Sequence, residues 1–126
     1  MIYGIGTDLC QIDRMEKSLA RAGFAAHVFS PEELSLLDSH TGRRRAETAA
    51  ANFAAKEAFL KACGTGLAGF ALREISVLRA ASGAPFYRLS GKAGQWAAEN
   101  GVRAHLSLTH EAGLACAFAL LEQGQC

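Results

Sequence analysis

The alanine-rich stretch at residues 46–63 constrains the fold more than any other part of the sequence. Alanine is the strongest helix former, and a glycine directly after the last periodic residue, here Gly64, is typical of a left-handed helix end. The stretch therefore predicts one long helix. Because apolar residues dominate its second half, FAAKEAFLKAC, we expect most of that half to be buried.

Shorter patterns on both sides of this helix complete the fold prediction. Ser30, Pro31 and Glu33 form a capping-box signature for a short helix that ends near Asp38. Period-two alternation predicts strands, and a change to the helical period predicts further helices. The remaining expected elements are a strand at 1–9, a helix at 12–22, strands at 74–80 and 86–89, a helix at 91–99, and strands at 105–109 and 114–121. This order favours an α+β fold with a mainly antiparallel sheet and a long central helix.

Length and composition exclude several classes of protein. A chain of 126 residues with half of them hydrophobic suits a single domain, residues 1–126. A net charge of +1 gives no global indication of nucleic acid as a partner. Neither a membrane-length apolar run nor an export signal is visible, so we expect a cytoplasmic protein with no membrane partner. The four cysteines form no CxxC pair, which favours reduced structural thiols over a zinc site or a disulfide framework.

Glu57 and Lys61 stand four residues apart on the predicted long helix, with the acid first. This spacing suits an exposed ion pair, which is one interpretation. The surrounding side chains are mostly apolar, however, and a buried charge needs a partner or a metal. The alternative interpretation is therefore half of a phosphate-binding site, in which Lys61 neutralises phosphate charge.

Asp8 could complete such a site from the end of the first predicted strand. Two carboxylates from different elements can hold Mg²⁺, which takes its remaining ligands from water and substrate phosphates. Asp8 and Glu57 are thus candidate metal ligands. The other interpretation of Asp8 is an N-cap of the helix expected near Ile12.

The helix expected at residues 12–22 carries a basic stripe opposite its apolar side. Arg14, Lys17 and Arg21 lie within roughly 60° of one another at 100° per residue. The stripe is either simply solvated or a docking surface for an acidic protein or a phosphate backbone. The near-neutral total charge favours the acidic protein.

Two other motifs give little support to catalysis. The glycines from Gly64 to Gly69 spell GxGxxG, but they follow a helix instead of opening one, so a dinucleotide fold is not expected. Ser107 and His110 lack the nucleophile elbow of a hydrolase, and a lining role suits them better. The arginines at 43–45 are expected in a loop, where they are either solvated or bind an anion.

Several motifs together carry a family resemblance. GIGTDL with QIDRM, SPEEL, FAAKEAFLKACGTG, the Gly83-Ala84-Pro85 turn and HLSLTHE occur in this order along nearly the whole chain. The sequence closely resembles the holo-acyl-carrier-protein synthase family of bacterial 4′-phosphopantetheinyl transferases. Membership implies transfer of the 4′-phosphopantetheine arm of coenzyme A to a serine of apo acyl-carrier protein, with release of adenosine 3′,5′-bisphosphate.

The resemblance also implies roles for individual residues. By similarity, Asp8 and Glu57 bind Mg²⁺ and Lys61 contacts the reacting phosphate, while Arg14, Lys17 and Arg21 dock the acidic carrier. Either Glu57 or a metal-bound water would accept the proton of the carrier's serine. Such transfer depends on positioning and charge neutralisation, so no nucleophile is needed in this chain. The resemblance further implies a homotrimer with sites between subunits and a role in fatty acid biosynthesis, a part of lipid metabolism.

Contacts with coenzyme A are expected from a further set of residues, namely Arg44, Arg45, Gly64, Thr65, Gly66, Pro85, Ser107 and His110. The sequence departs from the family at Asn52 and Ala84, where a basic residue is usual. Arg44, Arg45 or a neighbouring subunit could supply the missing charge. Two alternative functions use the same residues: a Mg²⁺-dependent pyrophosphohydrolase of coenzyme A, and a non-catalytic module that binds coenzyme A or an acidic protein.

Overall fold

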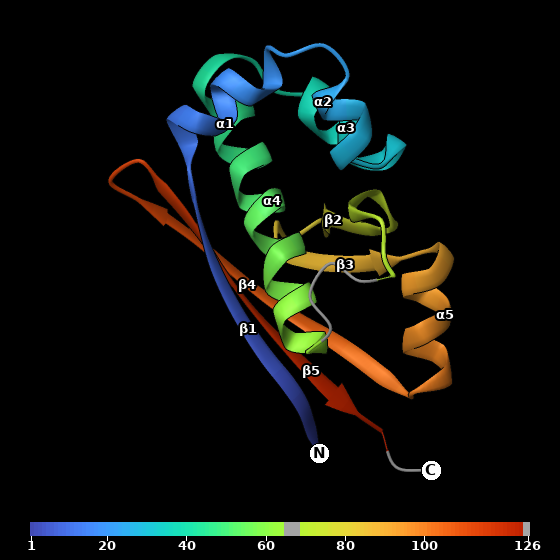
Figure 1. The fold of residues 1–126 in the computed structure, drawn as a ribbon. Coiled ribbons are helices and arrows are strands. Elements are labelled where there is room, and N and C mark those ends of the chain that lie inside the picture. Colours follow the sequence, from blue (N-terminus) through green and yellow to red (C-terminus); the bar gives the residue numbers. More distant parts are fainter. Residues whose placement is uncertain (65–68, 125–126) are drawn as a thin grey trace.

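The computed structural model describes residues 1–64 and 69–124, and it has the expected α+β architecture. A three-stranded antiparallel sheet of order β1-β5-β4 carries the long helix α4 on one face, and a separate hairpin, β2-β3, lies on the other side of α4 (Figure 1). The elements are β1 (Ile2–Gln11), α1 (Ile12–Leu19), α2 (Phe24–Val28), α3 (Pro31–Asp38), α4 (Gly42–Cys63), η1 (Leu72–Glu74), β2 (Ile75–Arg79), β3 (Pro85–Leu89), α5 (Gly91–Glu99), β4 (Val102–Glu111) and β5 (Leu114–Gln123). None of the helices among these residues is both long and apolar enough to cross a membrane.

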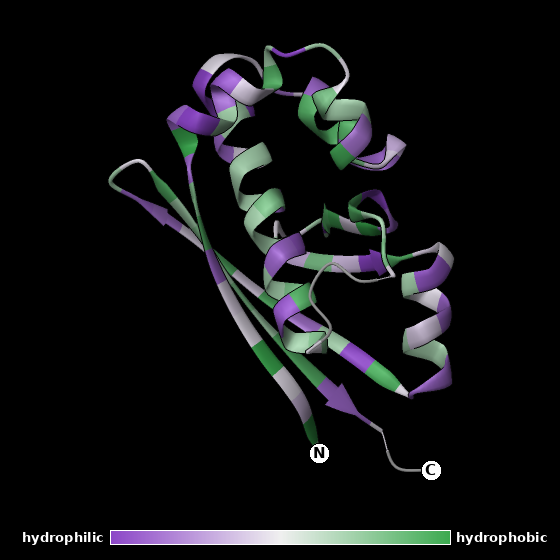
Figure 2. Ribbon diagram, viewed as in Figure 1, coloured by the Kyte–Doolittle hydropathy of each residue, from purple (hydrophilic) through white to green (hydrophobic). Residues whose placement is uncertain are grey.

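Helix α4 lies unusually close to strand β1 because two glycines of the strand face it. A Cβ atom added to Gly4 or Gly6 would stand 2.0 Å from a backbone oxygen of α4, that of Ala62 or Ala58 respectively. Any larger residue at either position would therefore push the helix away. The alanines of α4 complete this close contact, and in Figure 2 green, apolar stretches of its ribbon alternate with purple, polar bands.

The opposite face of the same sheet is apolar but uncovered. Because side chains alternate along a strand, Ile5 and Leu9 of β1 point away from α4, and the register of β5 places Phe118 beside them. These three side chains are 58%, 60% and 43% exposed. The monomer thus buries the glycine side of β1 and leaves its larger apolar side chains open to solvent.

Two helix boundaries differ from the sequence prediction. The first helix ends at Leu19, and Gly23, at φ 82°, precedes the short helix α2, which the sequence did not reveal. Helix α4 begins at Gly42, so residues 43–45 are helical and the predicted loop is wrong. Cations are unfavourable at a helix N-terminus, but Arg43 pairs with Asp13 and Arg45 lies 4.0 Å from Asp38.

The predicted capping box of α3 is confirmed, and it belongs to a buried polar network. The Ser30 hydroxyl accepts a hydrogen bond from the Glu33 amide, and the Ser30 amide donates to Glu33 Oε1. The same Oε1 accepts a bond from Nζ of Lys56, whose side chain is fully buried in α4. Lys56 also donates to the carbonyl oxygens of Leu72 and Ile75, at 2.9 and 2.7 Å. One buried ion pair therefore ties α3, α4 and the start of β2 together.

Candidate active site

Asp8, Glu57 and Lys61 lie together where β1 crosses the C-terminal half of α4. Lys61 Nζ donates to Asp8 Oδ1 at 3.1 Å and to the Thr7 carbonyl oxygen at 3.0 Å. The ion pair of Lys61 in the described chain is thus with Asp8 and not with Glu57, against the interpretation as an i, i+4 surface pair. Asp8 stands inside β1, and Gln11 occupies the N-cap of α1, so the interpretation of Asp8 as an N-cap is wrong.

The charges of the three side chains influence one another. The pKa of the Glu57 carboxyl is raised, first by burial and then by the negative charge of Asp8, while Lys61 opposes the rise. Asp8 and Glu57 are therefore close enough to repel each other. A cation shared between them would relieve this repulsion. Lys61, whose side chain is 56% exposed, can reach an anion in the adjoining solvent.

The donor set of this cluster fits Mg²⁺ better than a metal held entirely by protein. Within residues 1–64 and 69–124, no group of three or more His, Cys, Asp or Glu side chains could hold a metal ion. Two carboxylates that open onto solvent match the coordination preference of Mg²⁺, which keeps several water ligands and completes its coordination shell with substrate phosphates. The adjoining cavity of about 420 Å³ is lined by Thr7, Asp8, Leu9, Lys61 and Cys116.

A second cavity, of about 300 Å³, lies between the first half of α4, the β2-β3 hairpin and β4, and we call it the cationic cavity. Three of the residues expected to contact coenzyme A, Arg44, Pro85 and His110, line it. Arg45 and Ser107 are not among its lining residues, and Arg45 lines a different depression instead. Gly64 ends α4 at φ 78° away from this cavity, and Thr65 and Gly66 lie outside the described residues.

Arg79, at the end of β2, also lines the cationic cavity, and the sequence analysis did not identify it. A signal was present, because Ile75, Val77 and Arg79 alternate along the strand and share one face. Ile75 and Val77 are completely buried. An arginine that continues an inward-facing apolar row indicates a cation directed at the interior or at a cavity.

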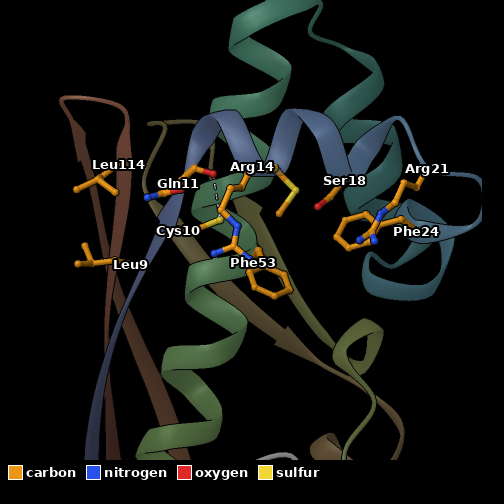
Figure 3. A pocket seen from close by; sticks show the side chains of 10 residues that line it. Leu9, Cys10, Gln11, Arg14, Ser18, Arg21, Phe24, Phe53 and Leu114 are labelled. Atoms are coloured by element: carbon orange, nitrogen blue, oxygen red, sulfur yellow. Dashed lines mark hydrogen bonds between the residues drawn. The ribbon is translucent and has the colours of Figure 1, made fainter.

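A third cavity, of about 520 Å³, lies beside α1 and combines basic with apolar side chains. Arg14 extends from α1 toward Phe53, and Arg21 lies beside Phe24, with its guanidinium 5.4 Å from the centre of that ring (Figure 3). The third member of the predicted basic stripe, Lys17, is not among the lining residues. Two arginines of the stripe thus border an apolar floor, which the sequence pattern did not indicate.

A family model for the 4′-phosphopantetheinyl transferase superfamily matches residues 4–119. The chain belongs to this superfamily. Among relatives of this superfamily, the holo-[acyl-carrier-protein] synthase of Methylibium petroleiphilum is 41% identical over 97% of each chain. That of Treponema denticola is 44% identical over 97% of this chain and 99% of its own.

Solved structures of phosphopantetheinyl transferases share the fold. The holo-[acyl-carrier-protein] synthase from Neisseria meningitidis superposes with a TM-score of 0.88, at 35% identity over 98% of this chain and 100% of its own. The synthase from Bacillus anthracis, solved in complex with CoA (3′,5′-ADP), has a TM-score of 0.85 at 32% identity, over 98% and 99% of the two chains. The α+β fold expected for a phosphopantetheinyl transferase is thus confirmed.

Asn52, where the sequence resemblance leads us to expect a basic residue, is completely buried in the polar network. Its amide nitrogen donates to Glu33 Oε2 at 3.1 Å and to the Val77 carbonyl oxygen at 2.9 Å, and its Oδ1 accepts a bond from Arg79. Ala84 lies in the turn of the β2-β3 hairpin. The arginines that line the nearby cavity are Arg44 and Arg79, and Arg45 is not among its lining residues.

Proposed function

We propose that this protein is a holo-acyl-carrier-protein synthase. It transfers the 4′-phosphopantetheine group of coenzyme A to a serine of apo acyl-carrier protein and releases adenosine 3′,5′-bisphosphate. Relatives that bear this name match nearly the whole chain. The observation that carries the proposal is the cluster of Asp8, Glu57 and Lys61, because it combines two mutually repelling carboxylates with an accessible cation. The proposal includes a role in fatty acid biosynthesis in the cytoplasm.

Asp8 and Glu57 would hold Mg²⁺, and when bound the metal supplies positive charge beside the pyrophosphate of coenzyme A. Lys61 contributes a point charge that neutralises the phosphate oxygens as the bond to the leaving group weakens. Its ammonium already lies on Asp8, so it is oriented before coenzyme A arrives. The attacking hydroxyl belongs to the carrier, and this chain's task is to hold both substrates in line.

The cationic cavity is the proposed place of the nucleotide end of coenzyme A. Arg44 and His110 face it, and Pro85 forms part of its wall, which supports three of the expected contacts. The contacts expected from Arg45, Gly64, Thr65, Gly66 and Ser107 remain predictions.

The two parts of the proposed site lie at opposite edges of one sheet. Asp8 is on β1, whereas His110 is on β4, and β5 runs between these strands. A site built between copies, in which β1 of one chain approaches the cationic cavity of the next, would join the two parts. The uncovered apolar face of the sheet supports such an assembly. We therefore propose a homotrimer, and a protein that sediments as a monomer at assay concentrations would contradict it.

The cavity beside α1 is the proposed docking surface for acyl-carrier protein. Arg14 and Arg21 suit an acidic partner, with Lys17 as a more distant charge. Arg14→Ala should raise KM for the carrier and leave KM for coenzyme A unchanged. Equal changes in both constants would remove the support for carrier docking at this surface.

The decisive experiment incubates the protein with coenzyme A, Mg²⁺ and an apo carrier and weighs the carrier by mass spectrometry. The carrier should gain one 4′-phosphopantetheine group, and no gain with a carrier that another synthase modifies would overturn the proposal. Asp8→Ala and Glu57→Ala should each abolish the gain, whereas Glu99→Ala, which removes an exposed carboxylate of α5, should not. Release of adenosine 3′,5′-bisphosphate without carrier would favour the pyrophosphohydrolase. Chelator-insensitive binding without turnover would favour the binding module.

A further inference from the structure

Arg79 is a half-buried cation whose described partners are all neutral. Nη2 donates to Asn52 Oδ1 at 2.9 Å, and Nη1 donates to the Leu78 carbonyl oxygen at 3.3 Å. No carboxylate among residues 1–64 and 69–124 lies within 4.0 Å of this guanidinium. Burial lowers the pKa of Arg79, and the charge of Glu33 opposes this only in part. A partly buried cation without an ion pair is costly unless it serves an anionic ligand.

Asn52 fixes the direction in which this guanidinium points. Its amide nitrogen faces two acceptors, Glu33 Oε2 and the Val77 carbonyl oxygen, so a flipped amide would set its oxygen against both. Oδ1 must therefore face Arg79. Glu33 is itself held by Lys56, so the whole chain of contacts leads back into the rigid core. The position of the Arg79 guanidinium is thus set by Asn52, a neutral side chain whose own hydrogen bonds are all formed.

The side chains around Arg79 give the cavity a positive character. Arg44 and His110 line it together with Arg79. The acid that lines the cavity with them is Glu47, whose Oε2 lies 4.0 Å from His110 Nδ1. Arginine pairs with phosphate through two parallel N–H bonds. Leu78 and Asn52 accept from only two of the five N–H donors of Arg79, so the remaining N–H groups can offer such a fork.

We propose that Arg79 binds the 3′-phosphate of coenzyme A and that Asn52 is its positioning residue. The proposal rests on the proposed function, which assigns the pyrophosphate of coenzyme A to the cluster of Asp8, Glu57 and Lys61. The remaining phosphate of coenzyme A is the monoester on the ribose. The proposed function places the nucleotide end of coenzyme A in the cationic cavity, which Arg79 lines. Arg79 thus determines the preference for coenzyme A over 3′-dephospho-coenzyme A.

The test compares these two coenzymes in the same carrier assay. Arg79→Gln should raise KM for coenzyme A roughly 10- to 100-fold, with kcat nearly unchanged, and should leave KM for 3′-dephospho-coenzyme A within about twofold. The preference for the 3′-phosphate then disappears. Arg88→Gln, which removes an exposed arginine of the neighbouring strand, is the matched control and should change neither constant. An equal rise for both coenzymes, or no rise, would overturn the role of Arg79.

Asn52 is tested through its effect on the same preference. Asn52→Ala leaves the Glu33–Lys56 pair but frees the guanidinium of Arg79. The preference for coenzyme A over 3′-dephospho-coenzyme A, measured as the ratio of the two KM values, should therefore fall. On a logarithmic scale, the fall should be about half of that caused by Arg79→Gln. An unchanged ratio would show that Asn52 does not position Arg79. If this variant does not fold, Arg79→Lys tests the guanidinium fork that Asn52 is proposed to orient, because a lysine keeps the charge without the fork and should recover only part of the preference.

A binding measurement separates this inference from the proposed function. Calorimetry with the protein alone compares adenosine 3′,5′-bisphosphate with adenosine 5′-monophosphate, and it needs neither carrier nor turnover. The wild type should bind the bisphosphate more tightly, and Arg79→Gln should remove the difference. If the carrier is never modified but this difference is found, the proposed function fails and the phosphate contact remains. If the carrier is modified and the difference is absent, only the role of Arg79 fails.

Discussion

Two lysines of α4, Lys56 and Lys61, stand five residues apart in the same motif, yet their surroundings are opposite. Lys56 is completely buried and directs its ammonium to Glu33 and two carbonyl oxygens. Lys61 is mostly exposed and lies on Asp8 beside an open cavity. The ammonium of Lys56 is fully bonded within the fold, whereas that of Lys61 remains available to a ligand.

A charged residue in an apolar helix can serve either stability or chemistry, and only its interaction partners show which of the two roles it has. Burial lowers the pKa of Lys56, and the carboxylate of Glu33 opposes this shift. The polar atoms around Lys56 therefore compensate for removing it from water. Around Lys61, by contrast, Asp8 also repels Glu57, so the repulsion between these two carboxylates is not fully compensated. A cation bound between the two carboxylates, together with a substrate phosphate, would relieve this repulsion.

The largest effect is expected from breaking the buried pair on its acidic side. Glu33→Gln keeps the shape of the side chain but leaves the Lys56 charge uncompensated in the core, which should cost about 3–5 kcal/mol of unfolding free energy. Urea unfolding followed by circular dichroism measures this loss. Glu32→Gln, at the exposed neighbouring position, is the control and should stay within about 0.5 kcal/mol. A loss below about 1 kcal/mol for Glu33→Gln would mean that the pair does not hold the core.

The exposed lysine should show the reverse behaviour, with a large effect on activity and a small one on stability. Lys61→Met removes a charge proposed to act on the reacting phosphate, so kcat should fall about 10²- to 10³-fold, a barrier increase of about 3–4 kcal/mol. Its surface ion pair with Asp8 contributes about 0–1 kcal/mol to folding.

Steady-state carrier modification and urea unfolding, measured on one preparation, test both parts. Lys92→Met removes an exposed lysine of α5 and should leave both quantities unchanged. If Lys61→Met instead lowers stability as much as Glu33→Gln does, the contrast between the two lysines is wrong.

Local sequence signals predicted the elements that depend on local chemistry. The capping box of α3, the end of α4 at Gly64 and the β2-β3 hairpin lie where propensity and periodicity placed them. Helix α2 has only five residues, too few for a periodic signal. The early start of α4 was missed because its basic first turn is unfavourable in isolation and is offset by acids of other elements, such as Asp13.

The candidate site shows the limit of sequence reasoning more clearly. The types of Asp8, Glu57 and Lys61 suggested metal and phosphate chemistry, but Asp8 and Lys61 are 53 residues apart. Their contact depends on how closely α4 can approach the glycines of β1, which no local pattern reveals. The roles of Lys56 and Arg79 were missed for the same reason, since each is defined by a partner from another element.

The smallest expected effect concerns Glu57, which stands between the two lysines in sequence. Its pKa is raised above the ordinary 4.5 by burial and by Asp8, so the folded chain holds this proton more tightly than the unfolded chain. The resulting stability is fully present below 4.5 and is lost as the pH rises through the folded pKa. In metal-free buffer, Glu57→Gln should therefore raise the unfolding free energy slightly near pH 7 and flatten its decrease above 4.5. Urea unfolding across this pH range, with chelator present, measures the effect. A variant that is less stable than the wild type near pH 7 would show that Glu57 supports the fold, as Lys56 does, and does not belong with the chemical group of Asp8 and Lys61.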